Sequence, residues 1–334
     1  MRTKGNTSER IKTGDATDFV RRSGGMTIGV AASGHNAGAA VRAAVLGAEL
    51  LGHGAIGGFA VFAVMNEEGA VNYRVTQRGG ITALALPEEW LHARRAAVIS
   101  SGPDRPEPLV QFLPSISGAG MVTGHRSPHL PGQDGIAVNK AVLARMVAGD
   151  SPQQAVDAVL AANPEADAGM IAMDINGQMG WGDSARVTRR GDQGRCHRHN
   201  DAARIVILHN SIDSQISLAE SLADLAWICM TGERSPTRFL YLRESIPIRA
   251  SDRDRIHIGP DGVIHAIDSA DPLIPTAQRA CWAIYRGGEV WQDDQQVGHV
   301  VAELKIDIAQ GQVCKSLGGS PVPVVMKEDQ HLTR

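Results

Sequence analysis

The sequence predicts an α+β fold in which mainly antiparallel sheets are covered by helices. Short apolar runs of strand length are joined by hairpin-type turns, which connect antiparallel neighbours. Two amphipathic helices are expected over 135–148 and 152–162, directly before a hairpin at 170–181. Each helix carries a single apolar stripe, so one face of one sheet would cover both. A mainly antiparallel sheet with helices on one face follows.

Composition excludes several functional classes. The 33 Lys and Arg residues are balanced by 36 Asp and Glu residues, and no long run of either sign occurs. Nucleic-acid and membrane-surface binders need a concentrated basic face, so neither partner is expected. No stretch of about 18 apolar residues could span a bilayer. The four cysteines are widely spaced, which favours a reducing, cytoplasmic location.

The elements before residue 130 follow from the pattern in order. Residues 1–25 are polar and are expected to form a disordered leader. A buried strand starts at Met26-Thr27, and Gly34-His35-Asn36 opens a helix that runs to residue 51, with Asn36 as its cap. Further strands are expected at the ranges 59–64, 71–75, 96–100 and 120–123.

The passage 134–183 carries the strongest local signals. Ser151 supplies a helix cap, Pro152 the first helical position and Gln154 the third, which together form a capping-box pattern. Asn176-Gly177 is typical of a type I′ turn, so it should lie exposed between two paired strands.

The last third is expected to be rich in strands. A strand at 204–208 and a helix at 215–230 precede a change in composition near 233–236. Hairpins are expected at 256–265 and 300–314. The predicted organisation is therefore a leader over 1–25, a domain over 26–233 and a β-rich extension or subdomain over 234–334.

Thr27 is the first candidate catalytic residue. If Thr27 became the amino-terminal residue, its α-amine would titrate near pH 8 and could act as the base for its own hydroxyl. Such a nucleophile needs no separate histidine. The alternative is an ordinary threonine in a strand.

A second cluster lies at 120–129, where a strand runs into a polar loop. Strand alternation places Thr123 and His125 on one face, and Arg126 could clamp a carboxylate. The alternative is a polar loop above a helix start. His35 and Asn36 lie in a turn that resembles a phosphate-binding turn, although it has few glycines and no lysine. A tight turn with a cap is the favoured explanation of these two residues.

Metal and cofactor sites have little support. The segment Cys196-His197-Arg198-His199 has metal-binding residue types, but no matching pair lies nearby as a zinc site requires. No nucleotide-binding or zinc-protease motif occurs. We therefore expect no cofactor and no metal, with a metal-assisted hydrolase using Cys196, His197 and His199 as a remaining alternative.

The order of these elements resembles the N-terminal-nucleophile (Ntn) hydrolases, and in particular an uncharacterised bacterial branch whose chains start at a Met-Thr strand. The resemblance covers mainly 26–40 and 118–183, through Thr27-Ile28-Gly29-Val30-Ala31, the helix–helix passage at 149–156 and the hairpin strand at 169–177. It implies an αββα sandwich with Thr27 as nucleophile. Because residues precede Thr27 here, they must be removed first.

Two functional hypotheses of different classes follow. The first is an amidohydrolase that cleaves a small amide or lactam with Thr27, Thr123 and His125 as catalytic residues and with Arg126, His35 and Asn36 binding substrate. The second is a catalytically silent protein of the same fold that binds a small anion or a protein. The scarcity of aromatic residues outside the last third, where Trp282, Tyr285 and Trp291 gather, also suggests a homo-oligomer.

Overall fold

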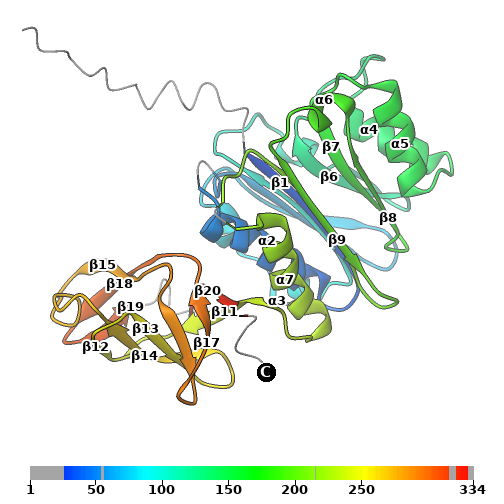
Figure 1. The fold of residues 1–334 in the computed structure, drawn as a ribbon. Helices are drawn as coiled ribbons and strands as arrows, with labels where there is room; N and C mark the ends of the chain where they lie inside the picture. The colour runs from blue at the N-terminus through cyan, green and yellow to red at the C-terminus, as the bar shows by residue number, and fades with distance from the viewer. Residues whose placement is uncertain (1–25, 54–55, 215, 316–320, 330–334) are drawn as a thin grey trace, which may run out of the picture.

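A computed structural model of the protein describes residues 26–53, 56–214, 216–315 and 321–329. The leader expected over 1–25 lies outside the described residues. Two antiparallel sheets pack face to face, and a pair of helices covers the outer face of each (Figure 1). The amino-terminal part is therefore an αββα sandwich, which confirms the predicted α+β class.

The first sheet has six strands in the order β3-β2-β4-β1-β10-β9. They are β1 (Thr27–Ser33), β2 (Ala60–Met65), β3 (Val71–Thr76), β4 (Arg95–Ser101), β9 (Gln193–His199) and β10 (Arg204–Asn210). Strand β1 lies between β4 and β10, and almost all of its residues are buried. Its apolar side chains alternate: Ile28 and Val30 pack under the helices, whereas Ala31 packs against the second sheet.

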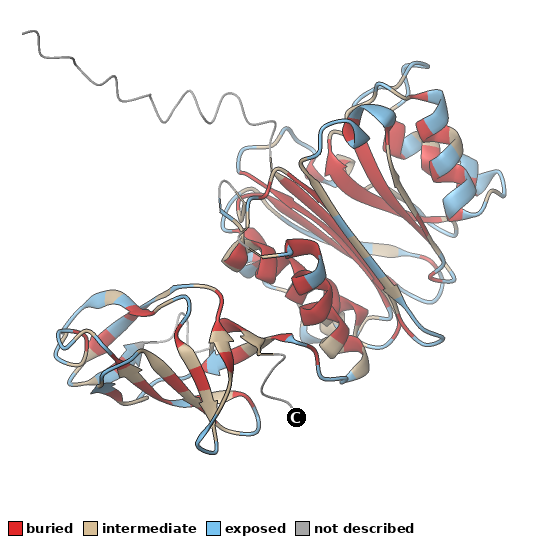
Figure 2. Ribbon diagram, in the orientation of Figure 1, coloured by how far each residue is buried: buried red, intermediate tan, exposed pale blue. Residues whose placement is uncertain are grey.

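Helices α2 (Ala37–Leu51) and α7 (Leu218–Thr231) lie side by side on the outer face of this sheet, and their inner surfaces are buried (Figure 2). Asn36 precedes α2, but its side chain makes no capping bond, which corrects the expectation from sequence. The amide of Asn36 donates instead to the carbonyl of Cys229 in α7, so it ties the two helices together.

The second sheet has four strands, β5 (Ser115–Ile116), β6 (Gly120–Arg126), β7 (Ala168–Asp174) and β8 (Met179–Asp183). Helices α4 (Val138–Val147) and α5 (Pro152–Ala162) share an apolar core with its outer face, as predicted. The capping box at Ser151 and Gln154 is present, so the chain begins α5 as its sequence specifies.

The β7–β8 turn differs from the expected type I′ turn. The backbone N–H of Gly177 donates to the carbonyl of Asp174, and only Gly177 in this turn has a positive φ. The Asp174 carboxylate accepts from the backbone N–H groups of Asn176 and Gln178, which favours this alternative. Asn176 is exposed as predicted, whereas Gly177 is buried and its carbonyl accepts a hydrogen bond from Ser33.

The two sheets approach most closely where two glycines meet. A Cβ on Gly29 of β1 would lie 2.3 Å from the carbonyl oxygen of Gly124 in β6. Any side chain at Gly29 would therefore force the sheets apart. This contact fixes β6 beneath β1 and sets the spacing at the end of the sandwich where Thr27 lies.

The rest of the chain is rich in strands, as expected. Six strands follow one another in the order β11-β20-β17-β16-β13-β14, and the pairing of β11 with β14 closes them into a ring. Strand β12 lies beside β14, and a separate sheet has the order β15-β18-β19. The expected 256–265 hairpin is β13–β14, and the later one is β18–β19, with 295–300 forming a strand of its own. The bounds are β11 (Thr237–Leu242), β12 (Ile248–Ala250), β13 (Arg255–Ile258), β14 (Val263–Ser269), β15 (Ala280–Ile284), β16 (Glu289–Gln292), β17 (Gln295–Val300), β18 (Leu304–Ala309), β19 (Gln312–Lys315) and β20 (Val322–Glu328).

Short helical turns complete the sandwich. They are η1 (Gly80–Ala83), α3 (Glu88–Leu91), η2 (Leu109–Phe112) and α6 (Ala185–Thr188). Among the described residues, no helix combines the length and the apolar character that crossing a membrane requires.

Candidate active site at the start of strand β1

Thr27 begins the central strand and is buried, with 4% of its surface exposed. Its neighbours across the sheet are Ser101 at the end of β4 and Asn210 at the end of β10. The Thr27 hydroxyl lies 3.3 Å from the Ser101 hydroxyl. Alternation along β1 directs Thr27, like Gly29 and Ala31, toward the space between the two sheets.

Ser101 connects Thr27 to a cation and to the preceding peptide group. Its hydroxyl donates to the carbonyl oxygen of Met26 and accepts a hydrogen bond of 2.5 Å from the Arg105 guanidinium. A serine hydroxyl carries one proton, and here that proton is directed at Met26. The Thr27 hydroxyl is therefore the donor in its contact with Ser101.

A cavity of about 30 Å³ opens beside Thr27. This volume holds roughly two water molecules. Its lining combines two arginines, a histidine and hydroxyl groups with an apolar wall, and consists of Thr27, Phe59, Ile99, Ser101, Arg105, Phe112, Arg126, Ser127 and His129.

Arg105 and His129 give this cavity its electrostatic character. Within the described part of the chain, Arg105 forms no ion pair with an acidic residue, and burial lowers its pKa. Burial and the nearby charge of Arg105 also lower the pKa of His129, which favours its neutral imidazole. The lining of the cavity therefore includes one cation without an acidic partner among the described residues and one imidazole whose neutral form is favoured.

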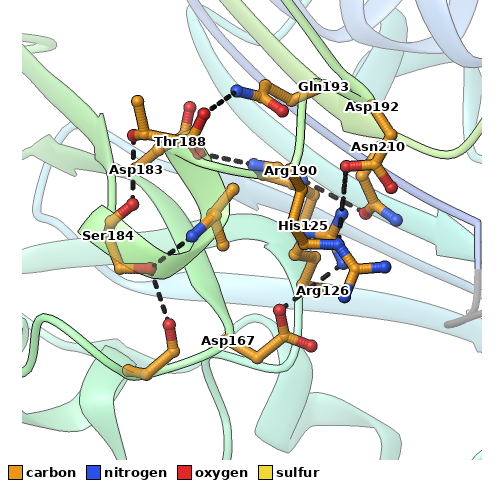
Figure 3. A network of polar contacts seen from close by, with 12 residues as sticks. His125, Arg126, Asp167, Asp183, Ser184, Thr188, Arg190, Asp192, Gln193 and Asn210 are labelled. Atoms are coloured by element: carbon orange, nitrogen blue, oxygen red, sulfur yellow. Dashed lines mark hydrogen bonds and ion pairs between the residues drawn. The ribbon is translucent and has the colours of Figure 1, made fainter.

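A paired polar network, drawn in Figure 3, adjoins the cavity through Arg126, which lines it. The Arg126 guanidinium bonds Asp192 and lies 3.4 Å from Asp167. His125 is fully buried, with Nε2 2.7 Å from Asp183 and Nδ1 3.2 Å from the Asn210 side chain. These contacts tie β6, β8 and β10 together beneath Thr27.

Asp192 shows how the network holds its charges. Burial alone would raise the pKa of Asp192, but hydrogen bonds from Ser211 and Arg126 outweigh it and keep the pKa below its usual range. Asp192 therefore remains ionised and neutralises Arg126, which leaves Arg105 as the cation available to a bound molecule.

The structure brings together only some of the candidates from sequence. Thr27 and Arg126 share the cavity, whereas His125 lies behind it and the Thr123 hydroxyl donates to the carbonyl of Val98. His35 and Asn36 follow the other end of the seven-residue strand β1. That end lies about 20 Å away at the usual rise of a strand, so neither residue reaches Thr27.

Sequence reasoning missed three residues of this site: Ser101, Arg105 and His129. His129 lies inside the polar segment 120–129, so the clustering of polar residues there was a usable signal. Ser101 and Arg105 end β4 and begin the proline-rich loop after it. Only the pairing of β4 with β1 brings them to Thr27, and a single sequence does not show that pairing.

The alternative metal site is not assembled. Along β9, Cys196 packs toward the helix-covered core. His197 instead contacts Trp181 in a tilted arrangement, with ring centres 5.2 Å apart, and stacks on His199. Strand alternation thus separates the thiol from the two imidazoles. Over the described ranges, no group of three His, Cys, Asp or Glu side chains could hold a metal ion.

Comparison with known families gives two matches. Residues 27–239 match a family described as a domain of unknown function, DUF6963, and residues 245–320 match a second one, DUF7259. No curated protein matches the chain. The first match starts at Thr27, includes both sheets of the sandwich and spans more than half of the 334 residues. The chain therefore belongs to the DUF6963 family.

Proposed function

We propose that the protein is an amidohydrolase of the N-terminal-nucleophile type, which cleaves a small amide or lactam with the hydroxyl of Thr27. The observation that carries the proposal is the position of Thr27. It begins a central strand between two sheets, and its hydroxyl contacts Ser101 beside a cavity that contains Arg105. The αββα layers and the resemblance of the sequence to Ntn hydrolases support the same reading.

The reaction requires Thr27 to be the amino-terminal residue. In the described chain, the Thr27 nitrogen belongs to the Met26–Thr27 peptide bond, and an amide nitrogen is not a base. Once the preceding residues are removed, this nitrogen becomes an α-amine with a pKa near 8. The positive charge of Arg105 would lower that pKa further, which favours the neutral amine that accepts the hydroxyl proton.

The Met26 carbonyl marks the place where a substrate carbonyl can bind. Its oxygen accepts a hydrogen bond from the Ser101 hydroxyl, which also contacts the Thr27 hydroxyl. Removal of Met26 frees that donor, while Arg105 still bonds Ser101 and increases the acidity of its proton. A substrate carbonyl at the same position would place its carbon beside the nucleophile and its oxygen on a donor suited to a developing negative charge.

The steps then balance as acyl transfer to Thr27 followed by hydrolysis. The Thr27 oxygen bonds to the amide carbon, and the α-amine takes the hydroxyl proton. The carbon–nitrogen bond breaks, and the leaving amine receives that proton. Water, deprotonated by the same α-amine, then attacks the carbon of the Thr27 ester. The bond between that carbon and the Thr27 oxygen breaks, the Thr27 oxygen takes the proton back from the amine, and the acid is released. Ser101 stabilises the oxyanion in both steps.

The test compares two forms of the protein on a panel of chromogenic small-acid anilides. The chain that begins at Thr27 should hydrolyse at least one anilide, and the full chain that keeps residues 1–26 should not, because its Thr27 nitrogen is an amide. In the shorter chain, Thr27→Ala should lower kcat by several orders of magnitude. Ser101→Ala should lower it by about 10²-fold, as loss of one oxyanion donor typically does.

Thr82→Ala is the matched control, since Thr82 is exposed and donates only to the carbonyl of Gly79. It should hydrolyse at the rate of the parent. Equal rates for the Thr27→Ala chain and its parent would refute the nucleophile. A folded Thr27-start chain that hydrolyses none of the anilides would favour the silent binding protein instead.

A further inference from the structure

A second cavity lies at the opposite end of β1 from Thr27, with a volume of about 370 Å³. Three turns of the sandwich, the β2–β3, β7–β8 and β9–β10 turns, meet there with the segment that enters β4. Its lining includes the end of β1 at Ser33, acidic Glu67 and Asp201, and three arginines, Arg94, Arg95 and Arg204.

Arg95 is the cation built into this cavity. Its side chain is only 9% exposed, and its NH2 group lies 2.6 Å from the carboxylate of Glu67. Its Nε is buried and finds no hydrogen-bond partner among the described residues. A guanidinium offers two parallel N–H groups to a bidentate oxyanion, and one Glu67 oxygen satisfies only one of them. A buried donor left unpaired costs stability, so the site favours a better acceptor.

Glu67 is a weak competitor for Arg95. Its side chain is 73% exposed, and an ion pair with an exposed carboxylate contributes little because water solvates that partner well. A bound oxyanion could therefore displace Glu67 from Arg95 at small cost. In this arrangement the Glu67 carboxylate occupies the position on Arg95 that a bound anion would take.

Arg204 supplies a second cation. Its guanidinium bonds the neutral side chain of Gln178 and makes no ion pair with an acidic residue in the described chain. Arg94 is exposed at the rim. Gly34 packs closely against the β9–β10 turn beside the cavity, since a Cβ on Gly34 would lie 2.5 Å from the carbonyl oxygen of Ala202. Three guanidinium groups thus face two carboxylates around an open cavity.

We propose that this cavity binds a small molecule through an oxyanion group, a phosphate or a carboxylate, held between Arg95 and Arg204 with Glu67 displaced. The site is separate from Thr27, because the length of β1 lies between them. It stands whether or not Thr27 is a nucleophile, since no residue of the Thr27 cavity lines it.

Calorimetric titration of the full chain tests this, with inorganic phosphate in one arm and malonate in the other at constant ionic strength. At least one anion should bind, and the stronger arm identifies the oxyanion. Glu67→Gln should tighten binding several-fold, because it removes the competing carboxylate. Arg204→Gln should weaken binding about tenfold, the effect of losing one charge-assisted hydrogen bond.

The two variants move in opposite directions and both alter residues that are not fully buried, so a loss of folding cannot mimic the result. Arg78→Gln is the control, because Arg78 is exposed and pairs only with Asp104 elsewhere on the surface. It should bind like the parent, and so should Thr27→Ala. No binding of either anion up to about 10 mM, which is weaker than about −3 kcal/mol, would overturn the proposal. Binding that neither Glu67→Gln nor Arg204→Gln changes would overturn it equally.

Discussion

The two ends of strand β1 carry similar charged residues, but the two ends differ in how far these residues are buried and paired. At the Thr27 end, the charged groups of the network are buried and paired, as in the contact of His125 with Asp183. At the Ser33 end, arginines surround an open cavity, and the acid paired with Arg95 is largely exposed. The first end holds most of its charged groups in fixed pairs and presents Arg105 to a small cavity, whereas the second end presents Arg94, Arg95 and Arg204 to a larger, open cavity.

This difference indicates how each end can work. A paired, buried network fixes atoms within tenths of an ångström, which acyl transfer requires of its nucleophile and oxyanion donor. The same network makes the Thr27 end of the strand intolerant of substitution. An open cavity with a displaceable carboxylate suits reversible binding, and its residues can change at small cost in stability.

The largest expected contrast concerns His125. His125→Ala leaves the Asp183 carboxylate, whose side chain is 2% exposed, without its partner. Leaving a buried charge unpaired costs about 3–5 kcal/mol of unfolding free energy. Urea denaturation should show this loss, and the double variant His125→Ala/Asp183→Asn should recover part of it, because the charge is gone.

His35→Ala is the matched histidine at the open end, where the side chain is exposed. It should change the unfolding free energy by less than about 0.5 kcal/mol. The comparison between the two ends would break if His125→Ala cost no more than His35→Ala.

A smaller contrast concerns pH. Glu49 of α2 lies at the Thr27 end, where it accepts the backbone N–H of Ile81, and burial raises its pKa from 4.5 to about 7. The folded chain therefore holds this proton more tightly than the unfolded chain, so stability falls as pH rises from about 4.5 to 7. The fall attributable to Glu49 should be about 2 kcal/mol, after allowance for its partial exposure.

His209, at the same end, acts in the opposite direction. Burial and the charge of His125 lower the pKa of His209 from 6.5 to about 4, so protonation destabilises the folded chain as pH falls from about 6.5 to 4.

The difference in unfolding free energy between the parent and Glu49→Gln isolates the Glu49 contribution. A difference that stays constant between pH 4.5 and 7 would contradict the assigned pKa.

Local sequence signals predicted the elements well and their contacts less well. The capping box at Ser151 and the strand at Thr27 depend on neighbouring residues, and both were predicted. The site depends on register: Ser101 is 74 residues from Thr27 and meets it only because β4 pairs with β1. The position of Asn36 shows the same limit, since a tertiary bond to α7 outweighed the local capping preference.

Covalent trapping of Thr27 tests the central claim most directly, because it requires no knowledge of the substrate. A β-lactone acylates a reactive hydroxyl as its ring opens, so the adduct adds the whole reagent mass. On the chain that begins at Thr27, intact-mass measurement and peptide mapping should find one adduct, on Thr27, and none on the full chain that keeps residues 1–26. Equal labelling of both chains, or labelling of the first chain at a residue other than Thr27, would contradict the account.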